Sequence, residues 1–123
     1  MPNFECSGTW MKSKLIFPTD TEKDGDITLN AEDGQGNFTG THHKTNKPVK
    51  GVCSAIKHIK FSRIQIRGKF TYTYTYEGDV APAASGSKIA NGTIKRVQTL
   101  LKKKIKNDDG DWVAERPPTL KRR

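Results

Sequence analysis

The sequence contains few of the residues that build a large hydrophobic core. Of its 123 residues, 33% are hydrophobic, and the mean hydropathy is −0.76. No run of apolar residues approaches the length that spans a membrane, which argues against a helical membrane protein. We therefore expect one small domain with a thin core and no membrane insertion.

Cysteine is scarce, with only Cys6 and Cys53. These two residues allow one disulfide, but the sequence does not show that their Cα atoms come within bonding range. No N-terminal apolar run resembles a signal peptide, which favours a cytoplasmic location, where thiols stay reduced. Secretion after removal of a leader is the alternative. In the cytoplasm, Cys53 is expected to be a small core residue.

The sequence also lacks the patterns of common catalytic sites. It has no nucleophile elbow, P-loop or dinucleotide-binding glycine pattern, so we expect no enzyme activity, no catalytic residue and no cofactor. His42 and His43 point to opposite faces of a strand and His58 is isolated, so no metal site is expected. The acidic segments 20–26 and 108–111 lack an EF-hand pattern and are interpreted as solvated turns.

What the sequence does contain is alternation with a period of two, which is typical of β-strands. The strands are expected at about residues 4–17, 27–31, 37–43, 49–57, 61–67, 70–76, 88–104 and 110–116. Short turns rich in glycine, proline and aspartate separate most of them, and a longer loop is expected at 79–87. A short helix over 97–105 is an alternative for part of the seventh strand.

This pattern predicts an all-β fold, an eight-stranded antiparallel up-and-down β-barrel. Closure into a barrel removes the exposed strand edges that invite aggregation. The barrel domain is expected to cover residues 1–117, followed by a basic tail at 118–123.

The clearest alternation is an aromatic ladder formed by Phe70, Tyr72, Tyr74 and Tyr76. Facing inward, the ladder would fill the barrel or contact a ligand. Facing outward, it would form a platform for stacking bases or a subunit interface. The sequence leaves these three interpretations open.

Positive charge exceeds negative charge, with 22 Lys and Arg residues against 13 Asp and Glu residues and a formal net charge of +9. Such an excess favours anionic partners, here nucleic acid or an acidic protein. The residues expected to contact such a partner are Arg63, Arg67, Lys102, Lys103, Lys104, Arg122 and Arg123. A solvated strand face with a disordered tail is the alternative.

Three segments, in order, resemble the calycins, and among them the avidins: residues 6–10, 36–41 and 107–116. The resemblance implies a lipocalin-like or avidin-like barrel in which Trp10 packs under Arg116 and closes the base. It also implies that such barrels associate into homo-oligomers. Trp112 matches a position that caps the ligand from a neighbouring subunit in avidins, which gives it a ligand or interface role.

The biotin site of the avidins does not carry over to this chain. Met11, Lys12, Ser13 and Lys14 replace small polar residues after the first tryptophan, and His42 replaces a tyrosine. We therefore expect a non-enzymatic binding protein that holds another small molecule or a peptide in its open end. The candidate ligand-binding residues are Tyr72, Tyr74, Tyr76, His42 and Trp112. The alternative is a cationic barrel that binds nucleic acid or an acidic protein through its outer face.

Overall fold

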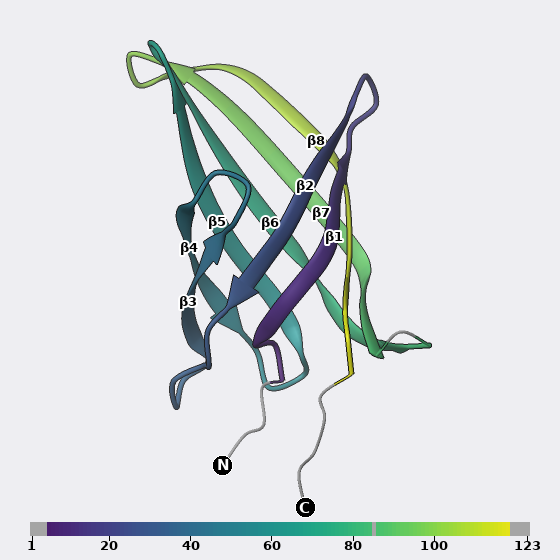
Figure 1. Ribbon diagram of the computed structural model, residues 1–123. Coiled ribbons are helices and arrows are strands. Elements are labelled where there is room, and N and C mark those ends of the chain that lie inside the picture. The colour runs from purple at the N-terminus through teal and green to yellow at the C-terminus, as the bar shows by residue number, and fades with distance from the viewer. Residues whose placement is uncertain (1–4, 85, 119–123) are drawn as a thin grey trace, which may run out of the picture.

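The computed structural model describes residues 5–84 and 86–118, and its strands close into one barrel (Figure 1). The eight strands are β1 (Gly8–Ile16), β2 (Thr21–Leu29), β3 (Asn37–His42), β4 (Lys47–Cys53), β5 (His58–Arg67), β6 (Phe70–Ala83), β7 (Gly86–Leu100) and β8 (Lys103–Arg116). Every strand is antiparallel to the next, and β1 pairs with β8, where Leu15 lies opposite Trp112. The predicted all-β, eight-stranded antiparallel barrel is confirmed.

The strands β5, β6 and β8 are longer than the sequence pattern indicates. The predicted loop at 79–87 is wrong, because β6 runs to Ala83 and the pairing of β6 with β7 continues to Gly86. The interpretation of residues 108–111 as a solvated turn is also wrong, because these residues lie inside β8 and the turn is at Leu101 and Lys102. The helix over 97–105 is excluded by the same pairing. No helix long and apolar enough to cross a membrane occurs in the described residues.

Because the strands differ in length, the barrel wall is taller on one side than on the other. In Figure 1, β5 to β8 rise above the short strands β3 and β4, which have 6 and 7 residues against 14 or 15 for β6, β7 and β8. The turn between β5 and β6 and the turn between β7 and β8 lie together at the upper end. This end of the barrel therefore has a high wall on one side.

The lower part of the barrel interior is apolar. Its buried side chains include Ile27, Leu29, Phe38, Val49, Ile59 and Phe61. The wall also uses glycine where strands approach closely: a Cβ atom at Gly51 would meet the carbonyl oxygen of Lys60. This agrees with the small residues seen in the sequence of β4.

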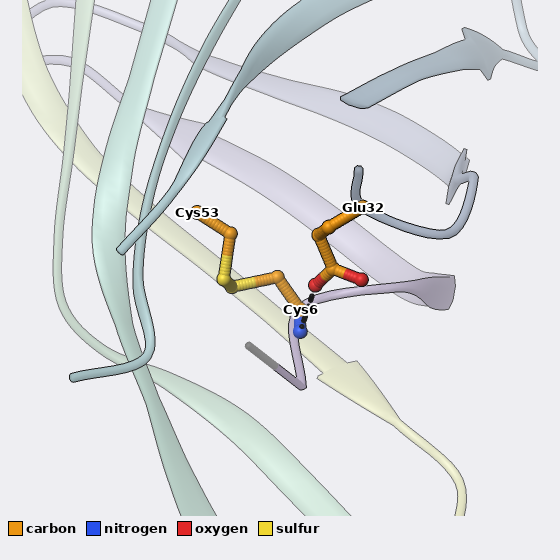
Figure 2. A group of neighbouring side chains, drawn as sticks. All are labelled: Cys6, Glu32 and Cys53. Carbon is orange, nitrogen blue, oxygen red and sulfur yellow. Dashed lines mark hydrogen bonds between the residues drawn. A yellow bond between two sulfur atoms is a disulfide. The ribbon is translucent and has the colours of Figure 1, made fainter. Parts of the chain in front are cut away.

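A disulfide joins Cys6 to Cys53 below this core and links the entry to β1 with the end of β4. In Figure 2, the Glu32 side chain lies beside the two sulfur atoms, and its Oε2 accepts the backbone N–H of Cys6 at 2.7 Å. The expectation that Cys53 is a reduced core residue is therefore wrong, although the residue is fully buried. Sequence pattern misses the bond because 47 residues separate the two cysteines.

Trp10 and Arg116 lie at the same end, with the Arg116 guanidinium carbon 4.6 Å from the centre of the indole ring. Arg116 Nη1 donates to the carbonyl oxygen of Ser7 at 2.7 Å, and Trp10 Nε1 donates to that of Cys6 at 3.0 Å. The contact expected between the first and last strands is present. We call this the disulfide end of the barrel, and the opposite end the open end.

Candidate functional site

The polarity of the interior changes from row to row toward the open end. Residues that pair directly across neighbouring strands share a face, so β5, β6, β7 and β8 present inward-facing rows. The first row is Phe61, Tyr76, Ile94 and Gly110, the second is Arg63, Tyr74, Arg96 and Asp108, and the third is Gln65, Tyr72, Gln98 and Lys106. Two residues along each strand are enough to pass from an apolar row to a charged one.

The aromatic ladder of β6 faces inward, which excludes the outward platform for stacking bases. Tyr76 is fully buried, Tyr74 is 3% exposed, and Tyr72 is partly buried near the open end. The Tyr76 ring stacks on Phe61, with ring centres 4.4 Å apart. The ladder therefore runs from the apolar core into the charged part of the interior.

Asp24 is the centre of a buried hydrogen-bond network. Its carboxylate accepts hydrogen bonds from the hydroxyls of Ser13 and Tyr76, both at 2.8 Å, and lies 2.7 Å from His42 Nε2. Arg63 Nη2 adds a longer contact at 3.3 Å. Asp24 is 2% exposed, so the interpretation of residues 20–26 as a solvated turn is wrong.

The backbone of β2 explains how Asp24 reaches the interior. Gly25 has a φ of 74°, and the pairing of β1 with β2 is irregular beside it. An irregularity of this kind changes which face of a strand points inward. Asp24 therefore points inward on one side of Gly25, and Ile27 and Leu29 point inward on the other.

The surroundings of Asp24 keep it ionised. Burial by itself raises the pKa of a carboxyl group, but the hydrogen bond and charge of His42, together with Arg63 and Ser13, hold the pKa of Asp24 below its ordinary value. For Tyr76, burial and the neighbouring Asp24 charge raise the pKa well above its ordinary value. The tyrosine thus stays protonated and donates to the carboxylate.

The network connects directly to the apolar core. Trp112 Nε1 donates to the Ser13 hydroxyl at 2.9 Å, and the Trp112 ring packs edge-on against Phe61 and Tyr76. Arg63 Nε donates to the Tyr76 hydroxyl at 2.9 Å. No buried side-chain nitrogen or oxygen atom in the described part of the chain lacks a partner. A network that is fully bonded in this way holds its members in fixed positions.

Above the network, Arg96 is surrounded by three carboxylates. It lies 3.0 Å from Glu22, 2.9 Å from Asp108 and 3.3 Å from Asp20. Burial lowers the pKa of an arginine, but these carboxylates raise the pKa of Arg96 above its ordinary value. The guanidinium carbon also lies 3.9 Å from the centre of the Phe17 ring. Arg96 thereby ties the β1–β2 turn to β7 and β8.

These charged groups border a hollow of about 280 Å³ at the open end. It is lined by Asp20, Glu22, Arg67, Tyr72, Tyr74, Arg96, Gln98, Lys106 and Asp108. Its walls hold three cations and three carboxylates, so their formal charges cancel. The Tyr72 hydroxyl and the Gln98 amide make no hydrogen bond to another described residue, which leaves both open to a ligand.

The candidate ligand residues divide into two groups. Tyr72 and Tyr74 line the hollow, whereas Tyr76, His42 and Trp112 lie beneath it and are at most 1% exposed. His42 is bonded on both ring nitrogens, since its Nδ1 lies 2.7 Å from Thr45 Oγ1. These three buried residues lie below the hollow and do not line it.

The residues expected to bind an anionic partner lie in different parts of the molecule. Arg63 is 5% exposed and bonded within the interior, so its assignment to the outer face is wrong. Arg67 is exposed beside the hollow, and Lys102, Lys103 and Lys104 are exposed at the tip of the hairpin formed by β7 and β8. Arg122 and Arg123 lie outside the described residues.

Sequence reasoning missed Asp24, Glu22 and Arg96 as members of the site. Glu22 and Asp24 are spaced by two, as are Ile27 and Leu29, and Gly25 marks the change of phase between the two pairs. A glycine inside an alternating pattern is a signal for a bulge. Read in this way, the acidic segment would have been predicted as a strand.

Among the described residues, one group has the residue types and spacing of a metal site: Cys6, Glu32 and Cys53 (Figure 2). The two sulfur atoms are bonded to each other, so neither is a thiolate that could ligate a metal. The two cysteines therefore form a covalent link, and Glu32 accepts a hydrogen bond beside it.

Comparison of the chain with protein-family models, curated proteins and solved structures gives no match. The functional argument therefore depends on the geometry of the barrel.

Proposed function

We propose that the protein is a non-enzymatic, calycin-like binding protein that holds a small polar molecule, or the end of a peptide, in the hollow at its open end. The observation that carries the proposal is a hollow that lies above a fully bonded buried network and has unbonded polar groups in its wall. The contact between Trp10 and Arg116 supports the likeness to calycins.

The walls of the hollow suggest the chemistry of the ligand. Because three cations and three carboxylates line the hollow, neither a strong anion nor a strong cation is favoured there. A neutral or zwitterionic molecule matches this balance and could lie against the Tyr72 ring. The volume of about 280 Å³ is at the lower limit of ligand pockets and sets the size of the molecule.

A thermal-shift screen with amino acids, nucleosides, short peptides and lipids tests this proposal. A compound that binds the folded protein raises Tm as its concentration rises above Kd. Replacing Tyr72 by Phe removes one hydroxyl and is expected to weaken the compound that binds by about fivefold, the effect of one neutral hydrogen bond.

The matched control is Thr73→Val, which removes a hydroxyl from the opposite face of the same strand. Binding by this variant should equal that of the unaltered protein. The proposal is overturned if no compound raises Tm, or if the Tyr72 and Thr73 variants lose affinity equally.

The disulfide bears on where the protein works. Disulfides persist in oxidising compartments and are rare in the cytoplasm, where thiols are kept reduced. The bond between Cys6 and Cys53 supports a location in an oxidising compartment, in place of the cytoplasm favoured by sequence. Thiol titration of the unfolded protein without reductant should find no free thiol, and two free thiols would contradict this proposal.

A further inference from the structure

The tips of two hairpins lie side by side at the open end (Figure 1). One is the turn between β5 and β6 at Gly68 and Lys69, and the other is the turn between β7 and β8 at Leu101 and Lys102. The pairing of Phe70 with Leu100 joins them. We call them the paired tips, comprising residues 64–72 and 97–106.

The paired tips carry positive charge only. Their cations are Arg67, Lys69, Lys102, Lys103, Lys104 and Lys106, and neither segment contains an aspartate or a glutamate. Arg67 and Lys106 line the hollow beside its carboxylates, and Lys106 lies 3.9 Å from Asp108. The four other cations, Lys69, Lys102, Lys103 and Lys104, form no ion pair with a described carboxylate. This local excess gives the tips a field that attracts an anionic surface.

The paired tips also expose large aliphatic side chains. Leu101 is 83% exposed, Ile66 is 71% exposed and Ile105 is 50% exposed. Ile64, on the same face of β5 as Ile66, is 55% exposed. Isolated exposed apolar residues are common on proteins, but here four of them lie on two hairpins that pair with each other and also carry lysines.

Leucine is energetically unfavourable in the backbone conformation that residue 101 adopts in this turn. Leu101 has a φ of 50° and Lys102 a φ of 68°, a region that suits glycine, asparagine or aspartate in two-residue hairpin turns. A branched, apolar residue gains nothing from the turn itself, and its side chain extends into solvent. Strain of this kind in a folded protein points to a function for the side chain.

We propose that the paired tips dock onto an anionic phospholipid surface, with Leu101 and Ile66 entering the headgroup layer and the lysines contacting lipid phosphates and carboxylates. A lipid surface offers negative charge and an apolar layer together. Single-stranded nucleic acid offers the charge, but its binding uses exposed aromatic rings on which the bases stack. The large hydrophobic side chains exposed at the paired tips are all aliphatic.

Sedimentation of the full chain with phosphatidylcholine vesicles, with or without phosphatidylserine, tests this proposal. We expect binding only when phosphatidylserine is present, and weaker binding as salt is raised. Each lysine near an anionic surface contributes about fivefold, so K102Q/K103Q/K104Q should weaken binding by about a hundredfold. Leu101→Gly keeps every charge and suits the positive φ, yet should weaken binding by about tenfold or more because an apolar side chain is lost.

Two matched controls come from other parts of the molecule. Ile56 is 83% exposed, like Leu101, but lies in the turn between β4 and β5 at the disulfide end. I56G and the charge-matched variant K47Q/K50Q/K60Q should each bind vesicles within about threefold of the unaltered protein. Circular dichroism of every variant confirms that each one folds.

Several results would overturn the proposal. They are absence of binding to phosphatidylserine vesicles, binding that does not depend on phosphatidylserine, and equal losses in the tip and control variants. Unchanged vesicle binding by Leu101→Gly would show a purely electrostatic contact. Retention on single-stranded DNA without vesicle binding would assign the tips to nucleic acid. Small-molecule binding in the hollow is measured separately and does not depend on the lysines altered here.

Discussion

The strands β2, β3 and β5 present Leu29, Phe38 and Phe61 to the interior near the disulfide end, and Asp24, His42 and Arg63 toward the open end. The same three strands thus line two environments. Near the disulfide end, burial of apolar surface stabilises the barrel without directional bonds. Toward the open end, each buried polar group needs its particular partner.

This difference determines which amino-acid substitutions each end of the barrel tolerates. An apolar core accepts other apolar side chains of similar volume at a modest cost. The network around Asp24 does not, because removing one member leaves charged or polar neighbours buried without a partner. Near the open end, the shape of the interior is therefore set by bonds, and near the disulfide end by volume and one covalent link.

The largest effect is expected from breaking the charged network. Asp24→Leu leaves Arg63 and His42 buried without their carboxylate and should lower the free energy of unfolding by about 3–5 kcal/mol. Urea unfolding measures this loss. Asp109→Leu, an exposed site on β8, is the matched control and should change stability by less than about 0.5 kcal/mol.

A double variant separates the cost of leaving the Arg63 charge unpaired from the other effects of replacing Asp24. Adding Arg63→Met to Asp24→Leu removes the arginine that Asp24→Leu leaves unpaired, so the double variant should be more stable than Asp24→Leu alone. If Asp24→Leu costs no more than Asp109→Leu, the network does not stabilise the open end.

Breaking the covalent link is the corresponding change at the other end. The disulfide joins residues 47 apart in sequence, and its loss through C6S/C53S should cost about 2–4 kcal/mol, because the unfolded chain gains conformational freedom. Guanidinium unfolding of the variant, and of the unaltered protein with and without a reductant, measures this effect. A reductant should destabilise the unaltered protein and leave the variant unchanged. Equal stability in all samples would contradict a structural role for the bond.

The smallest effect concerns a histidine near the disulfide end that differs from His42 in exposure. His58 lies between Asp79 and Glu77, both at 2.7 Å, and its side chain is 35% exposed. Hydrogen bonds to Asp79 and Glu77 raise the pKa of His58 above 6.5. Because the folded pKa is the higher one, the added stability is fully present below pH 6.5 and is lost as pH rises through the folded value.

Unfolding free energies measured from pH 5.5 to 8.5 should therefore fall slightly with pH in the unaltered protein. In His58→Gln this part of the slope should be absent. The effect is small because solvent screens the exposed carboxylates. Identical slopes in the two proteins would show that the pairs do not affect stability.

Much of the barrel is predictable because its strands alternate. In β6, four aromatic residues alternate with threonines, and the strand forms with the aromatic face inward. The contact of Trp10 with Arg116 is the one that the resemblance to calycins implies, and closure of the barrel brings the first and last strands together.

The site was harder to predict, because its interior face is polar. On β5, Ile64 and Ile66 lie outside and Arg63 lies inside, since the pleat that buries Ile59 and Phe61 continues along the strand. Hydrophobicity alone gives no reason to bury the arginine. The reason is Asp24, which belongs to another strand and lies 39 residues away in sequence.

The hydrogen bonds of Asp24 also bear on how the chain assembles. Its partners Ser13, His42, Arg63 and Tyr76 are separated from it by 11, 18, 39 and 52 residues. Contacts over such separations carry a loop-closure cost and form only when the strands that hold the two residues come together. The carboxylate is therefore fully bonded only when β1, β2, β3, β5 and β6 are all in register. The bonds of a single buried side chain thus require five of the eight strands to be in place.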